Sequence, residues 1–125
     1  MKIALTGVFV NDPKEAFKFY TQVLGFKERL FIPEANLAIV VSPEDPEGTG
    51  LLLEPTDNPI GKNYQQALYN ANIPSIVFVP DDVHTEYERL KKLGVIFRKE
   101  PTTSEWGTEA IFEDTCGNLI QLHKV

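Results

Sequence analysis

The chain nearly repeats itself at an interval of 69 residues, and this repeat constrains its fold more than any other feature. Six amino acids of the first half recur in the second: Val8, Phe9, Val10, Asp12, Leu24 and Gly25 match Val77, Phe78, Val79, Asp81, Leu93 and Gly94. Each copy begins with a β-prone stretch, continues with a capping aspartate and a helical pattern, and ends at a glycine. The repeat predicts two copies of one supersecondary unit in a pseudosymmetric domain.

The first copy predicts a β-α-β-β-β module. Residues 2–10 are apolar and β-prone, and Asp12 followed by Pro13 marks the start of a helix over 13–24. Gly25 stands where a left-handed cap ends a helix. Turn-forming stretches then separate three further strands, expected at 26–32, 37–41 and 51–53.

The second copy predicts the same order of elements. A helix is expected from Asp81 or Asp82 to Leu93, and strands at 75–79, 95–98, about 107–113 and 119–124. Module one covers about 1–56, a linker with a short helix over 64–69 covers about 57–72, and module two covers about 73–125. We therefore predict one α+β domain over 1–125. Its two modules should form a curved eight-stranded mixed sheet around a concave cavity, which is the expected ligand site.

Composition excludes several classes of partner and location. The net charge of −6 and the pI near 4.9 argue against nucleic acid and anionic membranes and favour cationic ligands. The single Cys116 cannot form an intrachain disulfide, and no apolar run approaches the roughly eighteen residues of a membrane span. The apolar start lacks a small-residue cleavage site, so we interpret it as the first strand and expect a cytoplasmic protein.

Three stretches of the sequence carry a resemblance to a known family. They are Val8 to Asp12 with the following Phe19-Tyr20 and Leu24-Gly25-Phe26, then Val79 to Val95, and finally Trp106-Gly107 through Leu122. Together they resemble the vicinal oxygen chelate superfamily, which includes glyoxalase I, extradiol dioxygenases, fosfomycin-resistance enzymes and bleomycin-resistance proteins. The resemblance implies paired β-α-β-β-β modules, a homodimer, and a metal in the curved sheet of the enzymatic members.

The metal ligands of this family are the point at which the sequence departs from the resemblance. Enzymatic members supply histidine from the first strand of a module and glutamate from the last, and those positions here hold Leu5, Pro74 and Gln121. Only Glu54 keeps a ligand-type side chain. A catalytic zinc needs three protein ligands and an open position. We therefore expect no metal site and no cofactor.

The predicted cavity remains, and polar and aromatic side chains are candidates to line it: Glu54, Trp106, Gln121, His123, Tyr64 and Phe31. His123 lies two residues after Gln121, so both point to one face of a strand. Each candidate also has a structural alternative. Glu54 can be a surface strand end, His123 a half-solvated residue, and the aromatic side chains part of a core.

The favoured function is metal-independent binding or sequestration of a small aromatic or cationic molecule, as the resemblance to bleomycin-resistance proteins implies. One alternative is a metal-dependent lyase, isomerase, transferase or dioxygenase whose altered ligand set uses Glu54, Gln121 and His123 with a divalent metal. Another is an interaction or regulatory module with a vestigial cavity. The sequence assigns no catalytic residue.

Overall fold

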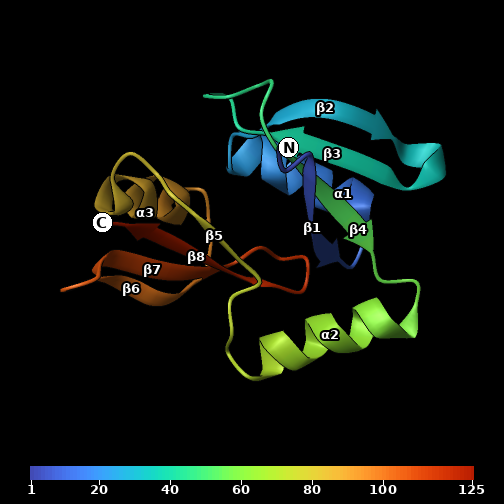
Figure 1. The fold of residues 1–125 in the computed structure, drawn as a ribbon. Coiled ribbons are helices and arrows are strands. Elements are labelled where there is room, and N and C mark those ends of the chain that lie inside the picture. Colours follow the sequence, from blue (N-terminus) through green and yellow to red (C-terminus); the bar gives the residue numbers. More distant parts are fainter. The chain divides into compact units, whose positions relative to one another are not determined.

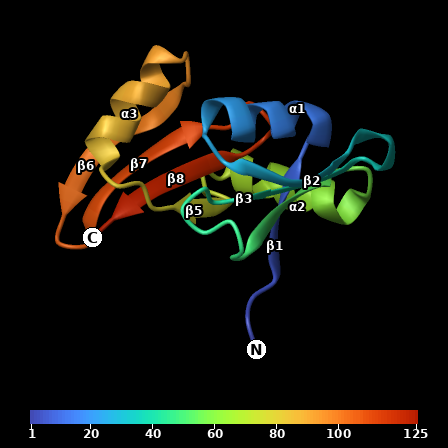
Figure 2. The same ribbon diagram turned by 90° about the horizontal axis from the view of Figure 1, so that it is seen from above.

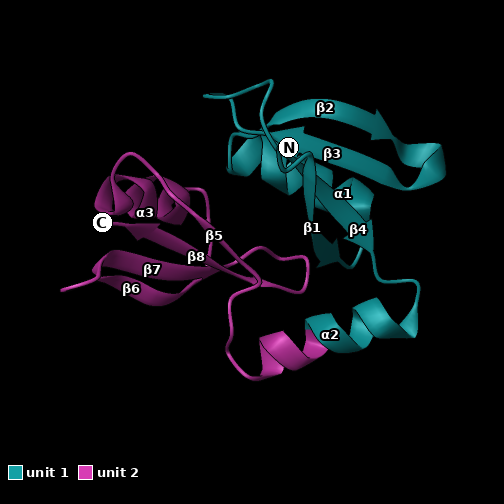
Figure 3. Cartoon of the chain, in the orientation of Figure 1, with its two compact units in different colours: residues 1–65 teal, residues 66–125 magenta.

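A computed structural model describes residues 1–125, and the chain divides into two compact units, Met1–Gln65 and Gln66–Val125 (Figure 3). The strands pair within two four-stranded sheets, one in each unit. The predicted α+β fold with eight strands in two β-α-β-β-β modules is confirmed.

Unit 1 contains β1 (Leu5–Val10), α1 (Pro13–Lys18), β2 (Lys27–Ile32), β3 (Leu37–Val41) and β4 (Gly50–Pro55). Its sheet has the order β1-β4-β3-β2, in which β1 is parallel to β4 and the other neighbours are antiparallel. Figures 1 and 2 show α1 packed along one face of this sheet. On the other face, Phe9 of β1 contacts Tyr64, which lies in the helix that follows β4.

Unit 2 repeats this arrangement with β5 (Ile76–Phe78), α3 (Val83–Lys92), β6 (Phe97–Ser104), β7 (Gly107–Glu113) and β8 (Leu119–Lys124). Its sheet has the order β5-β8-β7-β6, again with one parallel pair, and α3 covers one face (Figure 1). The helix α2 (Pro59–Asn70) belongs to unit 1 over its first half and to unit 2 over its second half. No helix is both long and apolar enough to cross a bilayer.

The two modules are equivalent, but the ungapped repeat of 69 residues is wrong by one residue in the first strand and the cap. Leu53 on β4 and Leu122 on β8 are equivalent buried residues, and their numbers differ by 122 − 53 = 69. Their strand partners are Val8 on β1 and Phe78 on β5, whose numbers differ by 78 − 8 = 70. The helix caps agree, because Asp12 caps α1 and Asp82, not Asp81, caps α3.

A π-helical turn over Phe19–Val23 absorbs the extra residue of unit 1. There the Leu24 N–H donates to the Phe19 carbonyl, and the Thr21 hydroxyl donates to the Phe17 carbonyl, which competes with the regular helical bond. Both helical segments then end at equivalent glycines, Gly25 and Gly94, with φ of +89° and +88°. The predicted continuous helix over 13–24 is therefore two elements.

Three other elements are longer than predicted, and one of them is β4, which spans Gly50–Pro55 rather than 51–53. Helix α2 starts at Pro59 rather than near Tyr64, because Asn58 Oδ1 caps the Gly61 N–H at 2.8 Å. Strand β6 continues through Pro101 to Ser104, where the sequence suggested an end at Arg98. An edge strand tolerates proline because its outer N–H groups have no strand partner, and β6 is an edge strand.

The core of each unit lies between its sheet and its own helix. Fully buried side chains include Tyr20 and Leu53 in unit 1 and Leu90, Phe112 and Ile120 in unit 2. The turn between β7 and β8 adds a buried carboxylate, Asp114, which accepts hydrogen bonds from the backbone N–H groups of Cys116 and Asn118. This network gives the Asp-Thr-Cys-Gly-Asn stretch a structural role.

Candidate functional site

A cavity of about 320 Å³ lies in unit 2, on the part of the sheet formed by β5, β7 and β8. Its lining residues come from these three strands, from the end of β6 and from the turn that follows it: Val77, Ser104, Trp106, Gly107, Glu109, Gln121 and His123. This volume is at the small end of the range for small-molecule pockets. All of these residues belong to unit 2.

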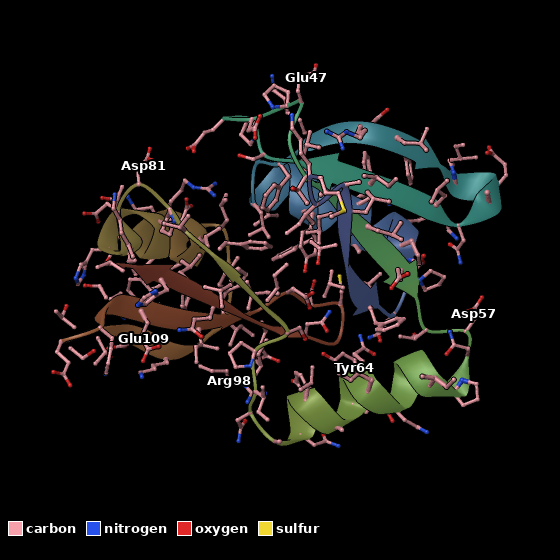
Figure 4. The ribbon with its side chains drawn as sticks, in the orientation of Figure 1. Glu47, Asp57, Tyr64, Asp81, Arg98 and Glu109 are labelled. Atoms are coloured by element: carbon pink, nitrogen blue, oxygen red, sulfur yellow. The ribbon has the colours of Figure 1, made fainter.

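Strand alternation explains why these side chains meet. Gln121 and His123 alternate with Ile120 and Leu122, which are buried toward α3, so the polar pair points to the face of the sheet opposite α3. Glu109 is the register partner of His123 on β7. Figure 4 shows Glu109 on the side of the unit 2 sheet away from α3.

Glu109 is the centre of a polar cluster. Its Oε2 accepts a hydrogen bond of 2.7 Å from Gln121 Nε2, and its Oε1 forms an ion pair of 2.5 Å with Lys99 Nζ. The Glu109 and Lys99 side chains are 32% and 41% exposed, so water screens the pair. The Gln121 amide is oriented by this contact, with its nitrogen toward the carboxylate.

The His123 side chain contacts the main chain of Trp106. His123 Nε2 lies 2.9 Å from the Trp106 carbonyl oxygen. Because a carbonyl only accepts, Nε2 carries the proton and a neutral ring presents Nδ1 as an acceptor. The Trp106 side chain is 75% exposed. Gly107 follows with φ of +120°, where a Cβ would lie 2.4 Å from the Lys124 carbonyl, so this turn requires glycine.

The structure brings three of the sequence-predicted site residues together: Trp106, Gln121 and His123 line the cavity. The other three lie in unit 1. Phe31 stacks on Phe17 with ring centroids 4.0 Å apart, and Tyr64 makes an edge contact with Phe9 at 6.2 Å. The Glu54 carboxylate lies over Gly7, and a Cβ added at Gly7 would be 3.0 Å from Glu54 Oε2.

Sequence reasoning missed Glu109 and Lys99. A signal for Glu109 is present, because counting back across the β7–β8 turn from His123 reaches Glu109 as its cross-strand neighbour. No comparable signal exists for Lys99. Two register shifts in β6, on either side of Lys99, remove the regular pairing from which its partner could be counted.

A second charged network lies on the same unit, around the end of α2. The Tyr69 hydroxyl donates to Glu113 Oε1, Arg98 Nη2 donates to the Tyr69 hydroxyl at 2.9 Å, and Arg98 Nε lies 3.4 Å from Glu113 Oε2. The hydrogen bond from Tyr69, together with Arg98, lowers the pKa of Glu113, and the bond to Glu113 raises the pKa of Tyr69. These contacts hold residues 66–70 of α2 on the unit 2 sheet.

Comparison with known proteins identifies the family. The family model described as Glyoxalase/Bleomycin resistance protein/Dioxygenase superfamily matches residues 2–122. The chain belongs to this superfamily. It is 44% identical over 124 residues to the uncharacterized protein YurT of Bacillus subtilis, with 98% of each chain covered.

Two solved structures of similar proteins support the assignment to the superfamily. UcmS2 has a TM-score of 0.82 and 28% identity, with 100% of this chain and 98% of that chain covered. TnmS3, described as an antibiotic binding protein from Streptomyces sp. CB03234, has a TM-score of 0.75 and 26% identity, with 98% and 94% covered.

The residues of this superfamily member do not assemble a metal-binding set of the usual kind. No group of three or more His, Cys, Asp or Glu side chains is placed to hold an ion. Strand pairing makes Ser75, rather than Pro74, the equivalent of Leu5, and the Ser75 hydroxyl donates to Asn118 Oδ1. Gln121 is a neutral amide whose nitrogen donates to Glu109.

Proposed function

We propose that this chain binds or sequesters a small molecule, without a metal, in the cavity of unit 2. The observation that carries the proposal is the combination of a mostly exposed tryptophan with an ordered polar cluster in one cavity. Such a combination offers apolar contact area and a few oriented polar groups, which is typical of ligand sites. The antibiotic-binding description of the similar protein TnmS3 supports the same class of function.

An aromatic or cationic ligand suits this cavity best. Trp106 offers a ring face for stacking and for cation–π contact, and the chain carries a net charge of −6. Gln121 and His123 would contact the polar groups of the ligand. Glu54, Tyr64 and Phe31 of unit 1 stay predicted ligand contacts, separately from the unit 2 cavity, and Glu54 is the strongest of them because its carboxylate forms no hydrogen bond or ion pair.

Fluorescence titration tests the proposal directly, because Trp106 is the only tryptophan. A panel of cationic aromatic compounds that includes bleomycin should change its emission and raise the melting temperature. Ligand at 100 times its Kd adds about 2.7 kcal/mol to the free energy of unfolding. Absence of both effects across the panel would contradict the proposal.

Two variants locate the binding. Trp106→Ala should abolish the thermal shift, whereas Ile96→Ala, which removes another exposed apolar side chain of unit 2, should leave it unchanged. Glu54→Gln tests the predicted contribution of Glu54: weaker binding supports it, and unchanged binding removes Glu54 from the proposal.

Elemental analysis tests the metal-independent part of the proposal. Protein purified without chelator should contain no stoichiometric transition metal, and its ligand affinity should be the same after EDTA treatment. A metal bound at one per chain, and lost in Glu54→Ala or Gln121→Ala, would favour the metal-dependent enzyme instead.

A homodimer is also part of the proposal. Several large apolar side chains are exposed on the strands of unit 1, among them Leu5, Leu30 and Ile32. Sedimentation should give a mass of twice 14.1 kDa. A monomer at micromolar concentration would remove this element of the proposal.

A further inference from the structure

We propose that the unit 2 cavity selects ligands through a cationic group that donates hydrogen bonds, such as an amidinium, guanidinium or ammonium, and that Glu109 is its counter-ion. This inference rests on the proposed function and names the ligand class and the residue that recognises it. Sequence reasoning did not include Glu109 among the site residues.

The first argument is the hydrogen-bonding character of the cavity. Gln121 donates one amide N–H to Glu109, so its oxygen remains as an acceptor and its second N–H as a donor. His123 donates a hydrogen bond from its Nε2–H to the Trp106 carbonyl, so Nδ1 of the neutral ring remains as an acceptor. The Glu109 carboxylate is itself an acceptor only. Most of the ordered polar positions in the cavity therefore accept hydrogen bonds from the ligand, whereas the second Gln121 N–H and the Ser104 hydroxyl are the cavity's donors.

The second argument is charge. Glu109 is the one carboxylate among the lining residues, and no lysine or arginine lines the cavity. Lys99 reaches Glu109 from β6 and neutralises it when no ligand is bound. Half-exposed ion pairs of this kind are weak because water solvates both charges. A ligand cation can thus replace Lys99, whose ammonium then returns to water.

The third argument is the apolar part of the cavity. Val77 and Trp106 are 54% and 75% exposed and lie beside the polar cluster, so an aromatic body can cover them while its cationic end meets Glu109. The cavity of about 320 Å³ suits a bicyclic ring better than a large drug. The geometry points to a compact aromatic cation.

Three probes of matched shape test the charge selection: 2-naphthamidine, 2-naphthamide and 2-naphthoate, each titrated into the whole protein by calorimetry. Their rings are the same and their polar ends are cationic, neutral and anionic. We expect 2-naphthamidine to bind most tightly and 2-naphthoate most weakly. Equal affinities, or tighter binding of the anion, would overturn the inference.

Variants then test the assigned counter-ion. Glu109→Gln should weaken the binding of 2-naphthamidine by about tenfold and leave the affinity for 2-naphthamide nearly unchanged, because only the charged hydrogen bond is lost. Glu88→Gln makes the same change of net charge on α3 and should have little effect. Lys99→Met should have the opposite effect and tighten the binding of 2-naphthamidine by about two- to fivefold, since the Lys99 ammonium no longer competes for Glu109.

The results separate this inference from the proposed function. If the probes and the wider panel all fail to bind, both are wrong. If ligands bind and change Trp106 emission but Glu109→Gln and Lys99→Met leave the cationic probe unaffected, binding stands and the assignment of Glu109 is wrong. Since the two variants predict opposite shifts, a folding defect in one does not remove the test.

Discussion

The two units share a topology but differ on the face that their own helix leaves uncovered. Strand pairing makes Leu52 and Glu54 of unit 1 equivalent to Gln121 and His123 of unit 2, at the offset of 69 residues between β4 and β8. Unit 2 joins its polar residues to Glu109 in one cavity, whereas unit 1 has a leucine and a single unpaired carboxylate there. The repeated pattern therefore specifies the helix-covered core, and the proposed binding chemistry lies where the units diverge.

The largest expected effects come from the shared core. Leu53 and Leu122 occupy equivalent positions on β4 and β8 and are 0% and 4% exposed. Leu53→Ala and Leu122→Ala should each lower the free energy of unfolding by about 2–5 kcal/mol, because each leaves a cavity under its helix. Chemical denaturation measures both. A cost below about 1 kcal/mol for either one would break the equivalence of the two cores.

A smaller effect separates the two loops between the third and fourth strands of each unit. Asp114 is fully buried and also accepts a hydrogen bond of 2.9 Å from Asn118 Nδ2, whereas Asp45 in the corresponding loop is exposed. Asp114→Asn should cost about 2–3 kcal/mol, since an amide cannot accept all three bonds. Asp45→Asn should stay within about 0.5 kcal/mol. Similar losses in the free energy of unfolding for the two variants would show that the two loops do not differ in their stabilising role.

The two halves of α2 should respond differently to acid. Gln65 Nε2 donates to the Phe9 carbonyl at 3.0 Å in unit 1, a neutral contact, whereas Tyr69 in unit 2 donates to ionised Glu113. Because the folded-state pKa of Glu113 is lowered, its contribution to stability is present above the ordinary glutamate pKa and is lost as the pH falls through the lowered value.

Hydrogen exchange measures this difference along one helix. Amides of residues 66–70 should lose protection at a higher pH than those of residues 59–65, and Glu113→Gln should remove the difference. Loss of protection at the same pH in both halves would contradict the role given to Glu113.

Sequence reasoning predicted the elements better than the contacts. The bounds of β3, β7 and β8 follow from local patterns, and the closing glycines were correct. The π-helical turn was not predictable, because one extra residue leaves the apolar pattern of a helix intact. Three of the six candidate residues share the cavity, since alternation along β8 is a local property. The ion pair of Glu109 with Lys99 depends on irregular pairing in β6, which no local pattern encodes.

Mapping a bound ligand onto the backbone tests the central claim most directly. Uniformly labelled protein, titrated with the tightest panel compound, should show its largest NMR shift changes at residues 104–109 and 121–123 and at the Trp106 indole. Shift changes confined to β1 and β4 of unit 1, or no saturable change in either unit, would contradict the assignment of the binding site to unit 2.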